Sequence, residues 1–341
     1  MCIRDSFVTA PQLGDIFARC LANQVAEVAD ALAQQKPGNY EILEAGAGSG
    51  ILAADLLTAL EDKHPPVRYR ILERSAHLRQ VQKETLARLV PHWIDRIGWL
   101  SEPPEEGWQG VFLANEVLDA LTVDRFSIES DGIRQLRVTN GPQGFGWEKT
   151  PCEDETRERI QAILSSLARE PAPGFQSELN PHLAAWLQAV TASLRKGVAM
   201  FIDYGSTRND YYHPQRSDGT LICHYQHRAH GDPFKWPGLT DISASVDFTA
   251  LAESADKCGL GVCGYTTQAM FLLGCGLDGL LADSQSLSER QKLRVNNQAR
   301  HLTLPGEMGE RFQVMALGRG LDDELANALR GFSVADYCHR L

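Results

Sequence analysis

The chain has 341 residues, of which 43% are hydrophobic, and carries a formal net charge of −11. This length can bury a sizeable core as one large domain with insertions or as two domains, and the negative charge argues against nucleic acid as the main partner, because phosphate binding requires basic patches. No stretch reaches the ~20 apolar residues that a membrane span requires. The eight cysteines contain no C-x-x-C pair, which is typical of reduced thiols in a cytoplasmic protein.

The first predicted element is a helix that begins near Gln12. Its apolar residues recur at helical spacing: Leu13, Ile16, Phe17, Cys20, Leu21 and Val25. Pro11 suits a first helical turn, and Thr9 is a suitable cap before it. The opening residues "MCIRDS" have neither the charge pattern nor the apolar core of a signal peptide.

A glycine-rich turn follows between a predicted strand and a predicted helix. The strand "YEILEAG" (40–46) is short and apolar, and the helix "ILAADLLTALEDK" (51–63) has leucines at helical spacing. Gly46, Gly48 and Gly50 lie between them, where a helix N-terminus offers unpaired N–H groups to a ligand. One glycine would suffice for packing, whereas three leave the floor of a pocket bare. We therefore expect a ligand rather than only a tight turn.

The spacing of these glycines distinguishes among nucleotide ligands. A P-loop requires a Gly-Lys-Ser/Thr ending, which the chain lacks, and an NAD fingerprint requires a glycine where Ile51 stands. Glu44, two residues before the first glycine, suits a cationic amine such as the methionine end of S-adenosylmethionine (SAM). Glu73 ends the next predicted strand, "VRYRILERS", where an acidic side chain can accept hydrogen bonds from ribose hydroxyls.

Predicted strands and helices alternate over the rest of the chain. Strands are predicted at 96–100, 110–114, 198–205, 259–268 and 311–320, a hairpin with a Ser-Asp-Gly turn at 123–139, and helices at 153–170, 180–197 and 246–259. Such alternation predicts an α/β fold with a mainly parallel sheet and helices on both faces, in which ligands sit beyond the carboxyl ends of the strands. Four polar residues fall at such ends: Glu44, Glu73, Asn115 and Asp203.

Several stretches, in chain order, resemble one protein family. They are "FVTAPQLGDIF" (7–17), "EAGAGSG" (44–50), "ANEVLDALTVDRF" (114–126), "FIDYG" (201–205) and "MGERFQVMALG" (308–318). Together they resemble the MidA-type SAM-dependent methyltransferases, a family that includes a mitochondrial assembly factor for respiratory complex I. The resemblance extends from about residue 7 to residue 319.

This resemblance implies a class I methyltransferase fold, with a Rossmann-like seven-stranded sheet in a single domain over residues 1–341. Insertions are expected at 122–195 and 206–245, the second on the substrate side. SAM is the implied cofactor, and arginine in a protein is the implied methyl acceptor. Family members carry a helical stretch before the first motif that this chain lacks, which predicts an N-terminal truncation, and Gln12 stands where the family has glutamate.

The predicted site residues divide into a cofactor set and a catalytic set. The predicted cofactor-binding residues are Thr9, Pro11, Glu44, Gly46, Gly48, Gly50, Glu73 and Asn115. Glu116 and Asp119 are expected to share one face of a helical turn that begins at Asn115. Their carboxylates can orient an amine or guanidinium and remove a proton. Asn115 also belongs to the catalytic set, because its side chain can accept a hydrogen bond from an amine. The alternative is a helix N-terminus made favourable by acidic residues, with Asn115 as its cap.

Three histidines, His224, His227 and His230, recur at every third position. Zinc is one interpretation, but no cysteine or acidic cluster nearby completes a tetrahedral set, so no metal is expected. His230 is the best functional candidate of the three, as a loop residue near the acceptor. Asp247 is expected to cap a helix rather than to catalyse.

Two other functions remain open from the sequence. One is a dinucleotide-dependent oxidoreductase, against which Ile51 and Glu44 argue. The other is a SAM-binding assembly chaperone that has lost catalysis. The identity of the protein substrate is expected to depend on the insertions, which the motifs do not describe.

Overall fold

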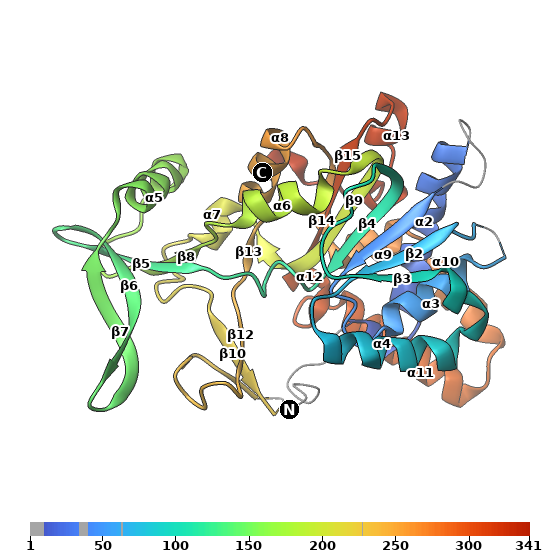
Figure 1. Cartoon of the computed structure of the whole chain (residues 1–341), viewed down its shortest axis with the longest axis horizontal. Coiled ribbons are helices and arrows are strands. Elements are labelled where there is room, and N and C mark those ends of the chain that lie inside the picture. Colours follow the sequence, from blue (N-terminus) through green and yellow to red (C-terminus); the bar gives the residue numbers. More distant parts are fainter. Residues whose placement is uncertain (1–9, 34–39, 63, 227) are drawn as a thin grey trace.

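The computed structural model describes residues 10–33, 40–62, 64–226 and 228–341. A central sheet has the strand order β14–β15–β9–β4–β1–β2–β3, and the short β13 extends it by pairing with β9 (Figure 1). The strands are β1 (Glu41–Ala45), β2 (Arg68–Leu72), β3 (Ile97–Leu100), β4 (Trp108–Asn115), β9 (Leu194–Ser206), β13 (Val246–Asp247), β14 (Gly261–Thr267) and β15 (Phe312–Arg319). Only β15 runs antiparallel to its neighbours in this path. The predicted seven-stranded, mainly parallel sheet is confirmed.

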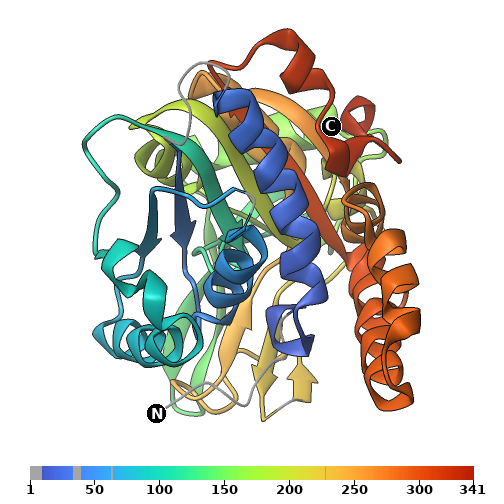
Figure 2. The same ribbon diagram turned by 90° about the vertical axis from the view of Figure 1, so that its right-hand side faces the viewer.

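Helices cover both faces of this sheet. The α-helices of the described residues are α1 (Ala10–Leu13), α2 (Ile16–Ala33), α3 (Ile51–Leu60), α4 (Ala76–Leu89), α5 (Asp154–Ser166), α6 (Leu183–Thr191), α7 (Arg208–Tyr211), α8 (Phe248–Lys257), α9 (Gln268–Gly274), α10 (Leu277–Asp283), α11 (Glu289–Thr303), α12 (Met308–Arg311) and α13 (Asp323–Asn327), of which α5 packs on the smaller sheet described below. Because side chains alternate along a strand, Ile42 of β1 packs in one core with α2 and α3, while Leu43 packs in the other with α6 and α8. Figure 2 shows α2 lying across the first of these faces.

Two smaller antiparallel sheets lie in the segments that the sequence marked as insertions. The first has the order β7–β6–β5–β8 and is formed by β5 (Asp124–Glu129), β6 (Gly132–Gly141), β7 (Gly144–Pro151) and β8 (Gln176–Leu179). It projects from the body with α5 (Figure 1). The second has the order β11–β10–β12 and is formed by β10 (Ile222–Tyr225), β11 (Arg228–His230) and β12 (Asp241–Ser243). The predicted hairpin is confirmed, since Glu129 pairs with Gly132 across its turn.

Two helix predictions were wrong in their extent. The N-terminal helix breaks at Gly14, whose missing Cβ leaves the space that the Gln298 side chain occupies. The helix predicted over 180–197 ends at Thr191, and the chain then enters β9 at Leu194. Gly197 does not end a helix: a Cβ atom there would lie 1.8 Å from the carbonyl oxygen of Gly110 on the neighbouring strand. Strand pairing decided this region, and helical spacing did not.

Candidate active site

The glycine turn between β1 and α3 has a backbone that glycine adopts without strain. Gly46, Gly48 and Gly50 have φ angles of 63°, 52° and 81°, in the left-handed region. A Cβ atom at Gly48 would find no other atom within 4 Å, whereas one at Gly46 would lie 3.1 Å from Val117 Cγ2. Gly48 therefore provides an open floor for a ligand, and Gly46 allows Val117 to approach.

Gln82 on α4 links this turn to Glu73, and the sequence analysis did not identify it. The side chain is fully buried, and its amide N–H group donates to Gly48 O at 3.1 Å and to Glu73 Oε2 at 3.2 Å. Trp99 Nε1 donates to its carbonyl oxygen at 3.0 Å, and the backbone N–H of Ser75 donates to Glu73 Oε1 at 2.9 Å. The only sequence signal for Gln82 was a polar residue on the apolar face of a helix.

These residues fit the nucleoside part of SAM. Each carboxylate oxygen can accept about two hydrogen bonds, so both oxygens of Glu73 retain capacity for ribose hydroxyls. The amide of Gln82 donates to both Glu73 and Gly48 O, so the backbone of Gly48 lies close to Glu73. An acidic ribose contact beside a glycine turn is the arrangement expected for a nucleoside at the end of a parallel sheet.

Glu44 lies in the interior behind the glycine turn. It is 2% exposed, and the hydroxyl of Tyr69 donates to its carboxylate at 2.8 Å. Burial raises the pKa of Glu44 to about 7, and the hydrogen bond from Tyr69 opposes this rise. The predicted contact of Glu44 with an amine stays a prediction.

The residues after β4 form a strained turn instead of the predicted helical one. Asn115 is the last residue of β4, and Glu116 has a φ angle of 54°, which is uncommon for a residue other than glycine. Asp119 lies in the following turn, where Leu121 N–H donates to Leu118 O at 3.2 Å. The expected shared helical face of Glu116 and Asp119 was therefore wrong, because the N–H of Glu116 donates to Ile202 O and the next three N–H groups donate to the side chain of Asp203. Strain of this kind clusters at functional sites.

Burial and neighbouring like charges perturb both carboxyl groups. Desolvation, with a smaller contribution from Asp119, raises the pKa of Glu116 to about 8, against hydrogen bonds from Asn115 and from the Ala10 backbone. Desolvation likewise raises the pKa of Asp119 to about 6, which a hydrogen bond from Ser243 opposes. Two neighbouring carboxyls with separated pKa values are a common acid–base arrangement.

Both carboxyls line a cleft of about 1330 Å³. Its charged lining comprises five acidic residues and three arginines, namely Glu116, Asp119, Asp210, Asp241, Glu310, Arg216, Arg311 and Arg340. Arg340 and Asp210 pair with each other, with Arg340 Nη2 2.9 Å from Asp210 Oδ2, which leaves four acidic residues and two arginines outside this pair. The cleft therefore favours a cation. Its lining does not include the glycine turn, Glu44 or Glu73, so the glycine turn and the acidic cleft are separate surfaces joined at Glu116 and Val117.

The sheet β11–β10–β12 forms one wall of the cleft. Along β10, His224 pairs with Asp241 of β12, and both line the cleft. His230 pairs with Cys223, the neighbour of His224 along β10, so its side chain lies on the opposite face of the sheet. There its ring lies against that of Trp236, with 5.6 Å between the centroids. The structure thus places His224 in the cleft wall and the predicted His230 on the other face.

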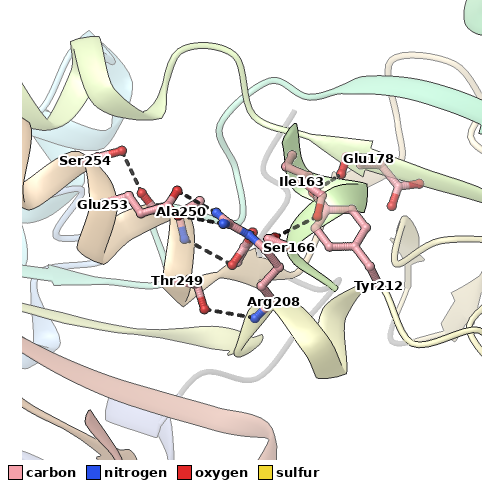
Figure 3. Close-up of polar contacts among 10 residues, drawn as sticks. Ile163, Ser166, Glu178, Arg208, Tyr212, Thr249, Ala250, Glu253 and Ser254 are labelled. Carbon is pink, nitrogen blue, oxygen red and sulfur yellow. Dashed lines mark hydrogen bonds and ion pairs between the residues drawn. The ribbon is translucent and has the colours of Figure 1, made fainter. Parts of the chain in front are cut away.

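Arg208, the first residue of α7, binds residues at the start of α8 and along it (Figure 3). Its guanidinium donates two hydrogen bonds of 2.6 Å to Glu253 and lies 3.3 Å from Asp247 Oδ2, while its backbone N–H donates to Thr249 Oγ1 at 3.0 Å. Asp247 also accepts from Ala250 N–H at 3.1 Å, which confirms its predicted role as the cap of α8. These contacts fix α7 to α8 behind the cleft.

The N-terminal motif reaches the same site. Pro11 is buried in α1, Gln12 lines the cleft, and the Ala10 backbone hydrogen-bonds to the Glu116 carboxylate. Thr9 lies outside the described residues. The described part of this motif, from Ala10 onward, therefore borders Glu116.

Within the described ranges, no group of three histidine, cysteine, aspartate or glutamate residues is arranged to hold a metal ion. Over the same ranges, none of the helices has the length and apolarity to cross a membrane.

Comparison with known proteins extends the resemblance. Residues 20–266 match a family described as S-adenosyl-L-methionine-dependent methyltransferase. The protein arginine methyltransferase NDUFAF7, mitochondrial, of Mus musculus is 27% identical, over 92% of this chain and 74% of the mouse protein. Its Danio rerio counterpart is 26% identical, over 91% and 76%.

A solved structure from Burkholderia thailandensis, bound to S-adenosyl-homocysteine, superposes with a TM-score of 0.89 at 39% identity. The match covers 98% of this chain and 84% of the Burkholderia chain. A native structure from the same organism gives a TM-score of 0.88. These matches confirm the predicted class I methyltransferase fold and SAM as the cofactor, and they remove support for a dinucleotide-dependent oxidoreductase. The chain belongs to the family of S-adenosyl-L-methionine-dependent methyltransferases.

Proposed function

We propose that this methyltransferase transfers the methyl group to an arginine side chain of a protein. The observation that carries the proposal is the pair of carboxyl groups, Glu116 and Asp119, on the floor of an acidic cleft large enough for a side chain and part of its peptide. A guanidinium is cationic and planar, and carboxylates bind it through paired hydrogen bonds. The named relatives, which are protein arginine methyltransferases, support the same acceptor.

On this proposal the cofactor is held on the glycine-turn side of Glu116. Gly46, Gly48 and Gly50 supply the floor for SAM, and Glu73 accepts hydrogen bonds from its ribose while Gln82 holds Glu73 in place. The predicted contributions of Glu44, Pro11 and Asn115 belong to the same proposal, as does that of Thr9 beyond the described residues.

Bound SAM supplies an electrophilic methyl group on a sulfonium. The main contribution of the protein is to hold an acceptor nitrogen in line with it. As the nitrogen–carbon bond forms, the carbon–sulfur electron pair passes to sulfur and the nitrogen loses a proton. Near neutral pH, Glu116 is mostly protonated and Asp119 mostly ionised. Entry of a guanidinium favours ionisation of both, so Glu116 releases its proton on binding and becomes free to accept the one from nitrogen.

The proposal extends to the cellular setting of this reaction. The matched relatives are named as mitochondrial, whereas the sequence composition predicts a cytoplasmic protein. A link to the assembly of a respiratory complex is implied by the family resemblance alone. We keep both the cytoplasmic location and this link as parts of the proposal.

The test is transfer of radiolabel from tritiated methyl-SAM to protein in a cell lysate, followed by acid hydrolysis and identification of the labelled amino acid. Labelled methylarginine supports the proposal, and label on another amino acid contradicts it. Glu116→Gln should keep SAM affinity and lose most transfer, while Glu158→Gln on exposed α5 is the matched control. SAM binding with no transfer to any protein would indicate the assembly-chaperone alternative.

A further inference from the structure

Asp203 binds the turn that carries the two proposed catalytic carboxyls. It lies near the end of β9 and is 1% exposed. Its Oδ2 atom accepts hydrogen bonds from the backbone N–H groups of Val117, Leu118 and Asp119, at 3.1, 2.8 and 3.2 Å. Its Oδ1 atom accepts from the N–H of Tyr204 at 2.8 Å. One buried side chain therefore satisfies three consecutive backbone donors of the turn.

These bonds explain how the strained backbone at Glu116 persists. A left-handed conformation costs free energy for glutamate and is retained only where the surroundings impose it. The N–H of Glu116 donates to Ile202 O at 2.9 Å, and the next three N–H groups all point to Asp203. Without this acceptor, three backbone donors would lose their partner, and that of Leu118 is buried.

Burial and nearby carboxyl groups disfavour a negative charge on Asp203. Desolvation, with Asp119 and Glu116 as nearby like charges, raises its pKa well above the usual range. Among the described residues, no arginine, lysine or histidine forms an ion pair with it. An asparagine could accept the three turn bonds on its carbonyl oxygen, but its amide nitrogen cannot accept the fourth bond, from the N–H of Tyr204. A carboxylate accepts all four, and these bonds favour its ionised form against the effect of burial.

We propose that Asp203 is the positioning residue of this site, holding the Val117–Asp119 backbone so that Glu116 and Asp119 face the cleft. Its negative charge also disfavours full ionisation of the pair until a cationic acceptor enters. This inference rests on the proposed acceptor chemistry. The other titratable or charged groups around the turn are Tyr204 of β9, Asp241 of β12 and Arg311 of α12.

Two substitutions separate geometry from charge. Asp203→Asn keeps an acceptor oxygen for the three N–H groups of the turn and removes the charge, while losing the bond from Tyr204 N–H. Asp203→Glu keeps the charge but displaces the oxygen by one methylene, so that the three bonds cannot all form. The matched control is Asp247→Asn, which alters another buried aspartate that accepts a backbone N–H group after a parallel strand, away from the pair. For each variant we would measure the melting temperature, SAM affinity and the initial rate of tritium transfer to the acceptor protein against pH.

We expect Asp203→Glu to lose about 100-fold in transfer rate with an unshifted pH profile, because the pair is misplaced. We expect Asp203→Asn to retain most of its maximal rate and to move the acid limb of the profile to lower pH. SAM affinity should be unchanged in both, and Asp247→Asn should move only the melting temperature.

The proposal is overturned by a wild-type rate in Asp203→Glu, or by an unshifted profile in Asp203→Asn. If Asp203→Glu does not fold, the Asp203→Asn profile alone decides. Glu116→Gln tests the proposed function independently of Asp203. A wild-type transfer rate in Glu116→Gln contradicts the proposed acceptor chemistry, whatever the Asp203 variants do.

Discussion

Replacing Glu116 by glutamine is expected to stabilise the fold at alkaline pH and to leave its stability unchanged at acid pH. The pKa of Glu116 is about 8 in the folded chain, raised from 4.5 chiefly by desolvation in the cleft. The folded state therefore retains a proton that the unfolded state releases. Stability is lost as pH rises from about 4.5 to about 8, and a neutral glutamine does not titrate.

The size of the effect follows from the change in pKa. A rise from 4.5 to about 8 corresponds to roughly 5 kcal/mol of unfolding free energy once the group is ionised. Because Glu116 is partly exposed to the open cleft, water reduces this penalty, and we expect about 2 kcal/mol at pH 9. For 341 residues that corresponds to a rise in melting temperature of about 3 °C.

The assay is thermal unfolding of the SAM-free protein at pH 5 and at pH 9. Wild type, Glu116→Gln and the exposed control Glu158→Gln are compared side by side. We expect a gain only for Glu116→Gln and only at pH 9. A gain of equal size at both pH values, or none at pH 9, would refute the argument that the cleft opposes the charge of Glu116.

Three further outcomes can be checked on the same protein. Gly48→Arg should abolish SAM binding by filling the open floor of the turn. The control Gly259→Arg, at a glycine of similar φ with equally open space, should bind SAM normally. Equal SAM titrations in both variants would contradict the assignment of the glycine turn to SAM. Gln82→Leu should weaken SAM binding about 10-fold, because Glu73 loses a buried donor, and should leave the rate at saturating SAM unchanged; a normal SAM affinity would show that Gln82 serves only packing. Calorimetry with an arginine-containing acceptor peptide at pH 7, in buffers of different ionisation enthalpy, should show release of about one proton from Glu116 on binding. No buffer dependence would mean that the pair is already ionised.

Local patterns in the sequence predicted the elements that local chemistry controls. The glycine turn, the apolar strands on both sides of it and the cap at Asp247 depend on residues a few positions apart. For the same reason the hairpin formed by β5 and β6 was predicted together with its turn. The motifs that carry the family resemblance can likewise be read directly along the chain. The placement of Glu73 at a strand end followed from the same periodicity.

Long-range pairing determined the rest of the site. Whether His224 or His230 faces the cleft depends on the register of β10 against β11 and β12, where a shift of one residue exchanges the two faces. Gln82 acquires its role only because α4 packs beside the glycine turn, 34 residues earlier in the chain.

The sequence by itself determined the fold class, the glycine turn and the positions of the acidic residues, because these depend on spacing along the chain. Only the tertiary structure decided the strained conformation of Glu116. That conformation is imposed by Asp203, whose contacts with the turn join residues about 85 positions apart. No local pattern contains such a contact, because its formation depends on β4 and β9 lying side by side in the folded sheet.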